Sequence, residues 1–272
     1  MESRTGLPAI NDIDATAPFR WLAGAWGDLW KAPVPLFAYG FLISMVSLAL
    51  TWGIYETNAA FWALALTFGF VFVAPMLAMG PYEAGRRLET GEKPKLGQIL
   101  FVRTAMRQDV AYLGLALLLI YFFWGRMAQL VYGLSTYQLY ETIPDFLRFA
   151  ASTQEGHNML IAGSIVGGAI AFLTFTLVVV SAPMLLDPRN NVFAAVATSF
   201  RAVSRHPGPL LLWAVIIAIL VAACAVSGFA AMVVIFPWLG LASWRAYRAL
   251  VAEETAQRPL KPVATMKTSE LS

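Results

Sequence analysis

The chain has 272 residues, of which 59% are hydrophobic and 13% are charged, and its formal net charge is +3. Soluble domains are roughly half apolar and a quarter charged, so this composition excludes an ordinary soluble domain and favours an all-α membrane protein. A single cysteine excludes an internal disulfide, and no CxxC or other metal-ligand spacing occurs.

The two ends of the chain are polar. Residues 1–18 have no basic segment followed by an apolar one, so the sequence predicts a polar N-terminal tail and no cleavable signal. Residues 253–272 carry almost no large apolar side chains and are predicted to form a disordered tail. A six-span membrane domain is expected between them, over residues 19–252.

A repeated surface helix is expected before two of the predicted hairpins. Its apolar residues have helical spacing and recur at one constant offset; they are Phe19, Leu22, Trp26 and Leu29 in the first copy and Phe193, Val196, Phe200 and Val203 in the second. Arg20, Asp28 and Lys31 lie off the first stripe, and prolines stop both helices. We expect both helices to lie in the membrane interface and to contact lipid or a partner protein.

Six apolar stretches are predicted to span the membrane. They cover about residues 36–54, 59–79, 110–130, 159–186, 210–226 and 229–246. The last two are separated at Ser227-Gly228, because one straight helix over the uncharged stretch 210–244 would be far longer than the bilayer core is thick.

Shorter elements complete the expected organisation. A weaker copy of the surface helix is predicted over 98–109 and another interfacial helix over 136–152, with Pro144 near its start or at a break. Ala182-Pro183-Met184-Leu185 repeats the motif of residues 74–77, and Phe236-Pro237-Trp238-Leu239 resembles both. The chain is therefore interpreted as three repeated units, each an interfacial amphipathic helix plus a helical hairpin.

Local spacings predict two kinds of contact. Small residues four positions apart favour close helix packing on the fourth span; they are Gly163 with Gly167, and Ser164 with Gly168. Glu83 precedes Arg86 and Arg87 by three and four residues, which places the three side chains on one helix face and predicts ion pairs.

Lysines and arginines predict the orientation. If successive loops alternate between two sides of the membrane, only Arg126 and Arg148 fall on one side and all other basic residues fall on the opposite side. Basic residues concentrate on the cytoplasmic side, so both termini are predicted to be cytoplasmic in a bacterial inner membrane. The positive charge reflects this bias and does not indicate nucleic-acid binding.

The predicted spans lack the residues that usually carry chemistry in a membrane. No carboxylate, lysine or histidine lies deep within them, although ion-coupled transporters usually need such groups. His157 and His206 lie at opposite edges of the predicted membrane domain, so they cannot form a bis-histidine haem site. No catalytic motif occurs. We therefore expect no cofactor, no metal and no enzymatic activity.

Four motifs occur in order along the chain: PFRWLAGAWGDLWKAPVPLFAYG, LAMGPYEAGRRLETGEKP, SAPMLLDPRNNVFAAVATSFRAVSRHPGPLLLW and FPWLGLASWRAYRALV. Together they resemble a proteobacterial domain-of-unknown-function family of predicted integral membrane proteins. The resemblance implies six spans in the inner membrane and no established activity. Some members carry the label of a cytochrome c oxidase subunit, which implies an association with the respiratory chain. The final motif of the family often has histidines where this chain has Leu241 and Arg245.

These features predict an inner-membrane protein that acts as a non-enzymatic accessory or scaffold for other membrane components. Its expected partners are the lipid bilayer and other inner-membrane subunits, and no nucleic acid. The alternative is a carrier or channel for an amphipathic or lipid-like substrate, since repeated units are common in transporters. An enzyme or redox subunit is a third interpretation, and visible absorbance of the purified protein would favour it.

Overall fold

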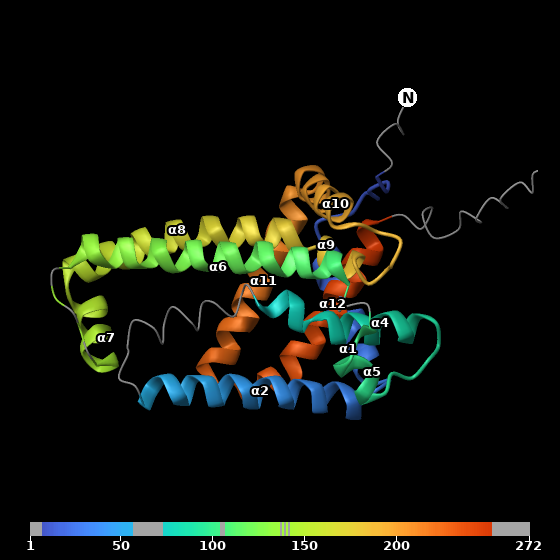
Figure 1. Ribbon diagram of the computed structural model, residues 1–272, viewed down its shortest axis with the longest axis horizontal. Coiled ribbons are helices and arrows are strands. Elements are labelled where there is room, and N and C mark those ends of the chain that lie inside the picture. The colour runs from blue at the N-terminus through green and yellow to red at the C-terminus, as the bar shows by residue number, and fades with distance from the viewer. Residues whose placement is uncertain are drawn as a thin grey trace, which may run out of the picture.

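The computed structural model describes residues 7–56, 73–103, 107–136, 138, 140 and 142–251, which form a bundle of helices (Figure 1). The helices of the first half are α1 (Ala17–Leu29), α2 (Pro33–Glu56), α4 (Met79–Glu89), α5 (Leu96–Leu100) and α6 (Gln108–Ser135). Those of the second half are α7 (Ile143–Ser152), α8 (Gln154–Val178), α9 (Ser181–Met184), α10 (Val192–Arg205), α11 (Pro207–Val226) and α12 (Met232–Leu250). Within these ranges the only β-type pairing is an isolated bridge between Ile10 and Val251.

Four of these helices are long and apolar enough to cross a membrane. The segments are Pro33–Gly53, Gln108–Ser135, Gln154–Met184 and Pro207–Val226, and they correspond to the first, third, fourth and fifth predicted spans. Most of the predicted span 59–79 lies outside the described residues. The predicted span 229–246 corresponds to α12, which is not among the four because its mean hydropathy is lower, with Arg245 and Arg248 in its last turns.

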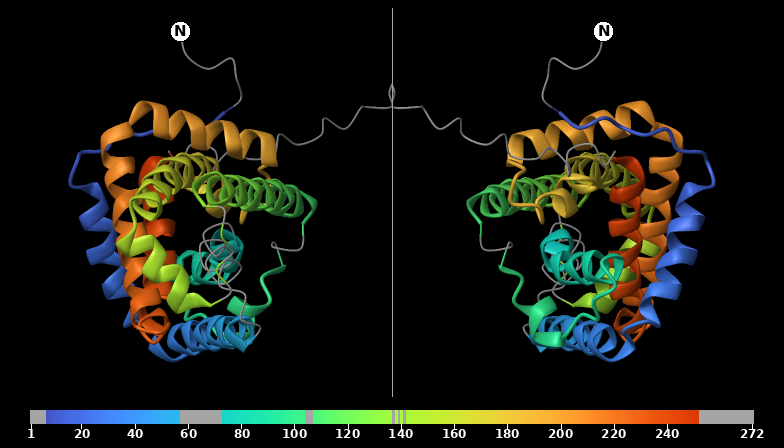
Figure 2. Two further views of the ribbon diagram at one scale, coloured as in Figure 1. Left: turned by 90° about the vertical axis from the view of Figure 1, so that its left-hand side faces the viewer. Right: turned by 90° about the vertical axis from the view of Figure 1, so that its right-hand side faces the viewer.

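The candidate spans do not share one direction. Figure 1 shows α2, α6 and α8 running lengthwise, with α11 and α12 across them, and Figure 2 shows α2, α6 and α8 end-on while α11 and α12 are seen lengthwise. The turn between α11 and α12, at residues 227–231, includes Gly228 with a φ of +60°. Ser44 of α2 donates a hydrogen bond to the carbonyl of Phe229 at 2.8 Å, which fixes this turn against α2.

The core is organised around α12, which packs against α1, α2 and α4. Two glycines allow close helix approach here. A Cβ on Gly40 of α2 would lie 2.1 Å from the carbonyl oxygen of Val233, and a Cβ on Gly240 of α12 would lie 2.4 Å from the Pro81 side chain. Because glycine has no side chain, the backbone of α2 contacts the backbone of α12 at Gly40, and the backbone of α12 contacts the Pro81 ring at Gly240.

The fourth predicted span, 159–186, is not one continuous helix. Helix α8 begins at Gln154 and ends at Val178, and the short helix α9 follows with every residue buried. Pro183 has no N–H to continue the regular helix ladder. Ser199 of α10 compensates at the break by accepting a hydrogen bond from the Val180 N–H at 3.2 Å and donating one to the Thr176 carbonyl at 2.6 Å.

The predicted N-terminal tail contains a packed segment. Pro8 and Ile10 are buried, and the Asn11 N–H donates to the Leu250 carbonyl at 2.8 Å. The Asn11 side-chain amide also donates to the Ala249 carbonyl at 3.1 Å. The apolar side chains of this mostly polar segment therefore attach residues 7–16 to the C-terminal end of α12.

Two predicted surface helices are shorter in the structure. In the described part of the stretch 98–109, α5 covers residues 98–100 and α6 begins at Gln108, while residues 104–106 lie outside the described residues. The interfacial helix expected over 136–152 corresponds to α7, where Pro144 occupies the first turn, while residues 137, 139 and 141 lie outside the described residues. The Thr142 hydroxyl accepts a hydrogen bond from the Asp145 N–H at 3.3 Å, and this N-cap explains the late start of α7.

Candidate functional site

The predicted apolar stripe of α1 is divided between two faces. Phe19 is 56% exposed and Trp26 is 43% exposed, whereas Leu29 is fully buried and Leu22 packs at the edge of the core. The inward face instead contains Trp21 and the small residue Ala25. The residues predicted to form one contact surface therefore serve partly as core and partly as surface.

Helix α10 has the same division at the equivalent positions. Phe193 is 81% exposed and Phe200 is 39% exposed, as their equivalents Phe19 and Trp26 are. Val203 is buried like Leu29, and Val196 packs at the edge of the core. Both helices therefore present two aromatic side chains outward from matching positions.

Aromatic side chains join α1 to its neighbours. The Trp26 ring centroid lies 5.9 Å from that of Trp30 and 5.3 Å from that of Trp238 of α12. Trp30 in turn lies 5.7 Å from Phe37 of α2, and the Trp238 indole N–H donates to the Leu22 carbonyl at 2.9 Å. Trp26 and Trp30 are exposed on one side of this group. Tryptophan in such a setting is typical of a membrane–water interface.

Asp28, a polar residue predicted to lie off the apolar stripe of α1, faces the core. Its carboxylate accepts hydrogen bonds from Arg245 Nε at 2.6 Å and from Lys31 Nζ at 2.7 Å, and Arg245 Nη2 forms an ion pair with it at 2.6 Å. A Cβ on Gly24 would lie 2.6 Å from Arg245 Nη1, so the missing side chain leaves room for the guanidinium. Burial raises the pKa of Asp28, but the hydrogen bonds from Arg245 and Lys31 outweigh burial and hold the pKa below its ordinary value.

The predicted ion pairs of Glu83 are confirmed. This buried carboxylate of α4 forms ion pairs with Nε of Arg86 and Nε of Arg87, each at 2.7 Å. Arg87 also contacts Glu92 at 3.0 Å, across the turn that follows α4. Because Arg86 and Arg87 follow Glu83 by three and four residues in one helix, local spacing was sufficient to predict the Glu83 pairs.

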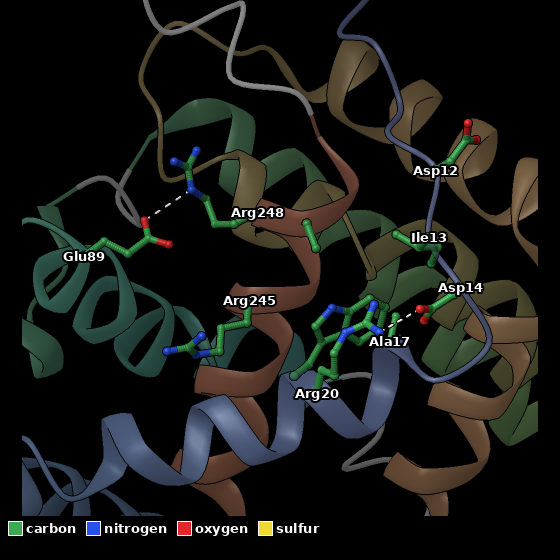
Figure 3. Close-up of a pocket in the computed structure, with 10 residues that line it drawn as sticks. Asp12, Ile13, Asp14, Ala17, Arg20, Glu89, Arg245 and Arg248 are labelled. Atoms are coloured by element: carbon green, nitrogen blue, oxygen red, sulfur yellow. Dashed lines mark hydrogen bonds and ion pairs between the residues drawn. The ribbon is translucent and has the colours of Figure 1, made fainter.

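A pocket of about 790 Å³ opens between the N-terminal segment, α1, α4 and α12 (Figure 3). Side chains of both charges line it; the full lining is Asp12, Ile13, Asp14, Ala17, Arg20, Trp21, Glu89, Arg245, Arg248 and Ala249. Arg20 pairs with Asp14 at 2.7 Å. Arg248 pairs with Glu89 at 3.2 Å on the side of α4. We call this site the mixed-charge pocket. The sequence did not predict it, because its residues come from three stretches that are far apart along the chain.

The small residues of α8 lie on two sides of that helix. Gly163 and Gly167 face α6, where a Cβ on Gly167 would lie 2.9 Å from the Trp124 ring. Ser164 and Gly168 are exposed, and a Cβ on Gly168 would meet no atom within 4 Å. Only the first pair of small residues therefore contacts another helix of the described chain.

Potential ligands for a metal or haem are dispersed. Among the residues that the structure describes, no group of three or more His, Cys, Asp or Glu side chains is placed to hold a metal ion. His157 Nε2 lies 3.0 Å from the Ala151 carbonyl in the α7–α8 region, whereas His206 lies near Asp12. Of the two positions where the resembling family often has histidines, Leu241 is buried and Arg245 binds Asp28.

Residues 63–187 match the sequence model of a family described as "Predicted integral membrane protein (DUF2189)". The match covers less than half of the chain and includes α4 to α9. Searches among curated proteins and among solved structures gave no match. Together with the four long apolar helices, the match shows an integral membrane protein whose middle part is similar to a membrane family of unknown function.

Proposed function

We propose that the chain is a non-enzymatic accessory or scaffold protein of the bacterial inner membrane, which holds other inner-membrane subunits beside it. The observation that carries the proposal is the pair of outward aromatic faces on α1 and α10, with Phe19 and Phe193 as their most exposed members. The oxidase label carried by some members of the resembling family makes respiratory-chain subunits the first partners to test.

The surroundings of α1 support its position at the membrane interface. Arg20 and Lys31 are largely exposed, Arg20 next to Phe19 at the start of α1 and Lys31 next to Trp30 after its end. A basic and an aromatic side chain therefore stand together at each end of α1. Anionic headgroups attract a nearby basic residue by about 1 kcal/mol, and tryptophan prefers the same depth. A subunit that approaches at this depth would meet the exposed aromatic rings first.

Replacing Phe19 and Phe193 together with serine tests the accessory role. Both side chains are exposed, so the double variant is expected to reach the membrane in normal amounts and to lose its co-purifying subunits. Leu147→Ser is the matched control, because Leu147 is a 53% exposed apolar residue on the separate surface helix α7. Quantitative mass spectrometry of the affinity-purified protein measures the amount of each variant and the amount of its co-purifying subunits. If the double variant disappears from the membrane while the control remains, the faces only anchor the helices in lipid, and the accessory role loses its support.

The orientation is tested by reporter fusions. Fusions after Gly91, Asn190 and Ala256 are expected to report the cytoplasm, and a fusion at Ser152 the periplasm. The loops that contain Gly91 and Asn190 lie at the end of the molecule where α6 begins and α8 ends, and Ser152 lies at the opposite end (Figure 1). The concentration of lysine and arginine favours the first end as the cytoplasmic one. A periplasmic signal after Asn190 would contradict this topology.

A carrier for an amphipathic or lipid-like substrate is the second candidate. It is favoured by one observation: in the described parts of the four candidate spans, charged residues lie near the helix ends, apart from Arg126 in α6. A lipid-like substrate needs no charged path through the bilayer, whereas an ion does. Movement of a fluorescent phospholipid across reconstituted vesicles measures this function, and equal rates with and without the protein would exclude it.

A further inference from the structure

We infer that the mixed-charge pocket binds a zwitterionic headgroup that carries both a phosphate and a primary ammonium, as phosphatidylethanolamine does. The pocket has the size of a small-molecule site and draws its lining from the N-terminal segment, α1, α4 and α12. Its charged side chains divide equally between three guanidinium groups and three carboxylates, and this balance determines the class of ligand.

The guanidinium groups provide the phosphate-binding part. Arg245 presents its Nε and Nη2 edge to Asp28, so that Nη1 points away from this carboxylate. Arg20 uses Nη1 for Asp14 and Thr16. A guanidinium has five N–H donors in a planar fork, so a carboxylate that takes one edge of Arg20 or Arg245 holds the group in place without using all of its donors.

The carboxylates provide the ammonium-binding part. Asp14 and Glu89 are paired with Arg20 and Arg248, but both remain substantially exposed toward solvent. Asp12, the third carboxylate, lies 3.1 Å from Arg205 of α10. A purely anionic headgroup has no group that could bind these carboxylates, whereas a primary ammonium can donate three hydrogen bonds to them.

The apolar part of the pocket favours a lipid as the source of the headgroup. Ile13, Ala17 and Trp21 contribute to the lining, and Trp21 packs edge-on against Trp213 with ring centroids 5.7 Å apart. Phe19 is exposed one position from Arg20. Acyl chains of a lipid bound through its headgroup would therefore have exposed apolar surface close to the pocket.

This site is independent of the accessory role, because its residues are distinct from the exposed aromatic pairs of α1 and α10. The test uses the full chain in nanodiscs with equal fractions of phosphatidylethanolamine, phosphatidylcholine and phosphatidylglycerol. After mild detergent extraction, native mass spectrometry counts the retained lipids. We expect about tenfold preference for phosphatidylethanolamine, because the choline headgroup has no N–H and the glycerol headgroup has no cation.

Variants decide whether the pocket causes this preference. Arg20→Gln with Arg248→Gln should reduce the retained phosphatidylethanolamine about tenfold, since charge-assisted hydrogen bonds to the phosphate are lost. Arg148→Gln is the control, an exposed arginine on α7 that also pairs with an aspartate. Should the double variant fail to fold, Asp14→Asn alters one exposed carboxylate and should selectively reduce the preference over phosphatidylcholine.

Each outcome has a definite meaning. Equal retention of the three lipids, or an equal loss with Arg148→Gln, would overturn the proposal. If free phosphoethanolamine displaces the lipid, the headgroup alone supplies the binding chemistry. If it does not, while the pocket variants still lose the lipid, the ligand is the complete phospholipid.

Discussion

Replacing Arg245 with leucine is expected to destabilise the protein by about 2–4 kcal/mol. The change removes the main partner of Asp28, whose side chain is 10% exposed, and leaves it with the more exposed Lys31. A buried carboxylate without sufficient partners is costly, whereas removal of both charges can be nearly neutral. The free energy of unfolding in detergent, measured by denaturant titration, gives the size of the effect.

Two variants serve as controls for this prediction. Arg248→Leu removes an arginine from a pair with the 41% exposed Glu89, so a loss below about 1 kcal/mol is expected. The double variant Asp28→Leu with Arg245→Leu should recover most of the stability lost in the single variant. If Arg245→Leu and Arg248→Leu are equally mild, Asp28 does not have the buried pairing described here.

The same pair predicts a dependence of stability on pH. The pKa of Asp28 is held below its ordinary value of 3.8 because hydrogen bonds from Arg245 and Lys31 outweigh burial. A carboxyl with a lowered folded-state pKa contributes stability above the unfolded-state value and loses it as the pH falls through the folded-state value. In Arg245→Leu burial is opposed by Lys31 alone, so the Asp28 pKa is higher than in the natural protein. The difference in stability between the two proteins should therefore be constant near neutral pH and shrink as the pH falls through the range between their folded-state pKa values.

Gly40→Leu is expected to cause the other large loss, about 3 kcal/mol or more. Even the Cβ of the new side chain would lie 2.1 Å from the Val233 carbonyl oxygen and 2.8 Å from its carbon, so the backbones of α2 and α12 must separate. The melting temperature of the purified protein measures the effect.

Gly53→Leu is the matched control for this substitution. Gly53 lies in the same helix, and a Cβ there would meet no atom within 4 Å. Leucine is a better helix former than glycine by up to about 1 kcal/mol, so the control should be neutral or slightly stabilising. Equal melting temperatures for the two variants would show that α2 does not pack on α12 through Gly40.

Local patterns predicted the features that depend on neighbouring residues. The long apolar helices α2, α6, α8 and α11 lie within or close to predicted spans, because hydropathy is read over one continuous segment. The ion pairs of Glu83 were predicted because Arg86 and Arg87 follow it by three and four residues in the same helix. The Asp28–Arg245 pair joins residues 217 positions apart, and neither residue has a local signal that identifies its partner.

The packing of α12 against α1, α2 and α4 could not be predicted from hydropathy. Its apolar run was interpreted as a sixth span, because burial in protein and burial in lipid demand the same residue types. The structure shows contacts such as Gly40 with Val233 and Gly240 with Pro81, which bring distant segments together, and the sixth span itself stays a prediction. The crossing of α11 and α12 over the other helices likewise depends on tertiary contacts at residues 227–231.

The faces of α1 and α10 show a second limit of periodicity. Aromatic residues are exposed while Ala25, Asp28 and Ser199 are buried, so hydrophobicity alone does not identify the inward face. In a membrane environment, exposed aromatic rings can face lipid or another membrane protein without meeting water. The exposures match at equivalent positions of the two helices, and the three-unit repeat stays a prediction.

The most direct measurement of the accessory role is purification of the tagged full chain from native membranes in mild detergent, with intact mass and subunit composition determined. The proposed function predicts a complex in which at least one other integral membrane protein is present at a fixed ratio through successive purification steps. A single species with the mass of this chain, lipid and detergent alone, obtained under conditions that preserve known complexes of the same membrane, would contradict it.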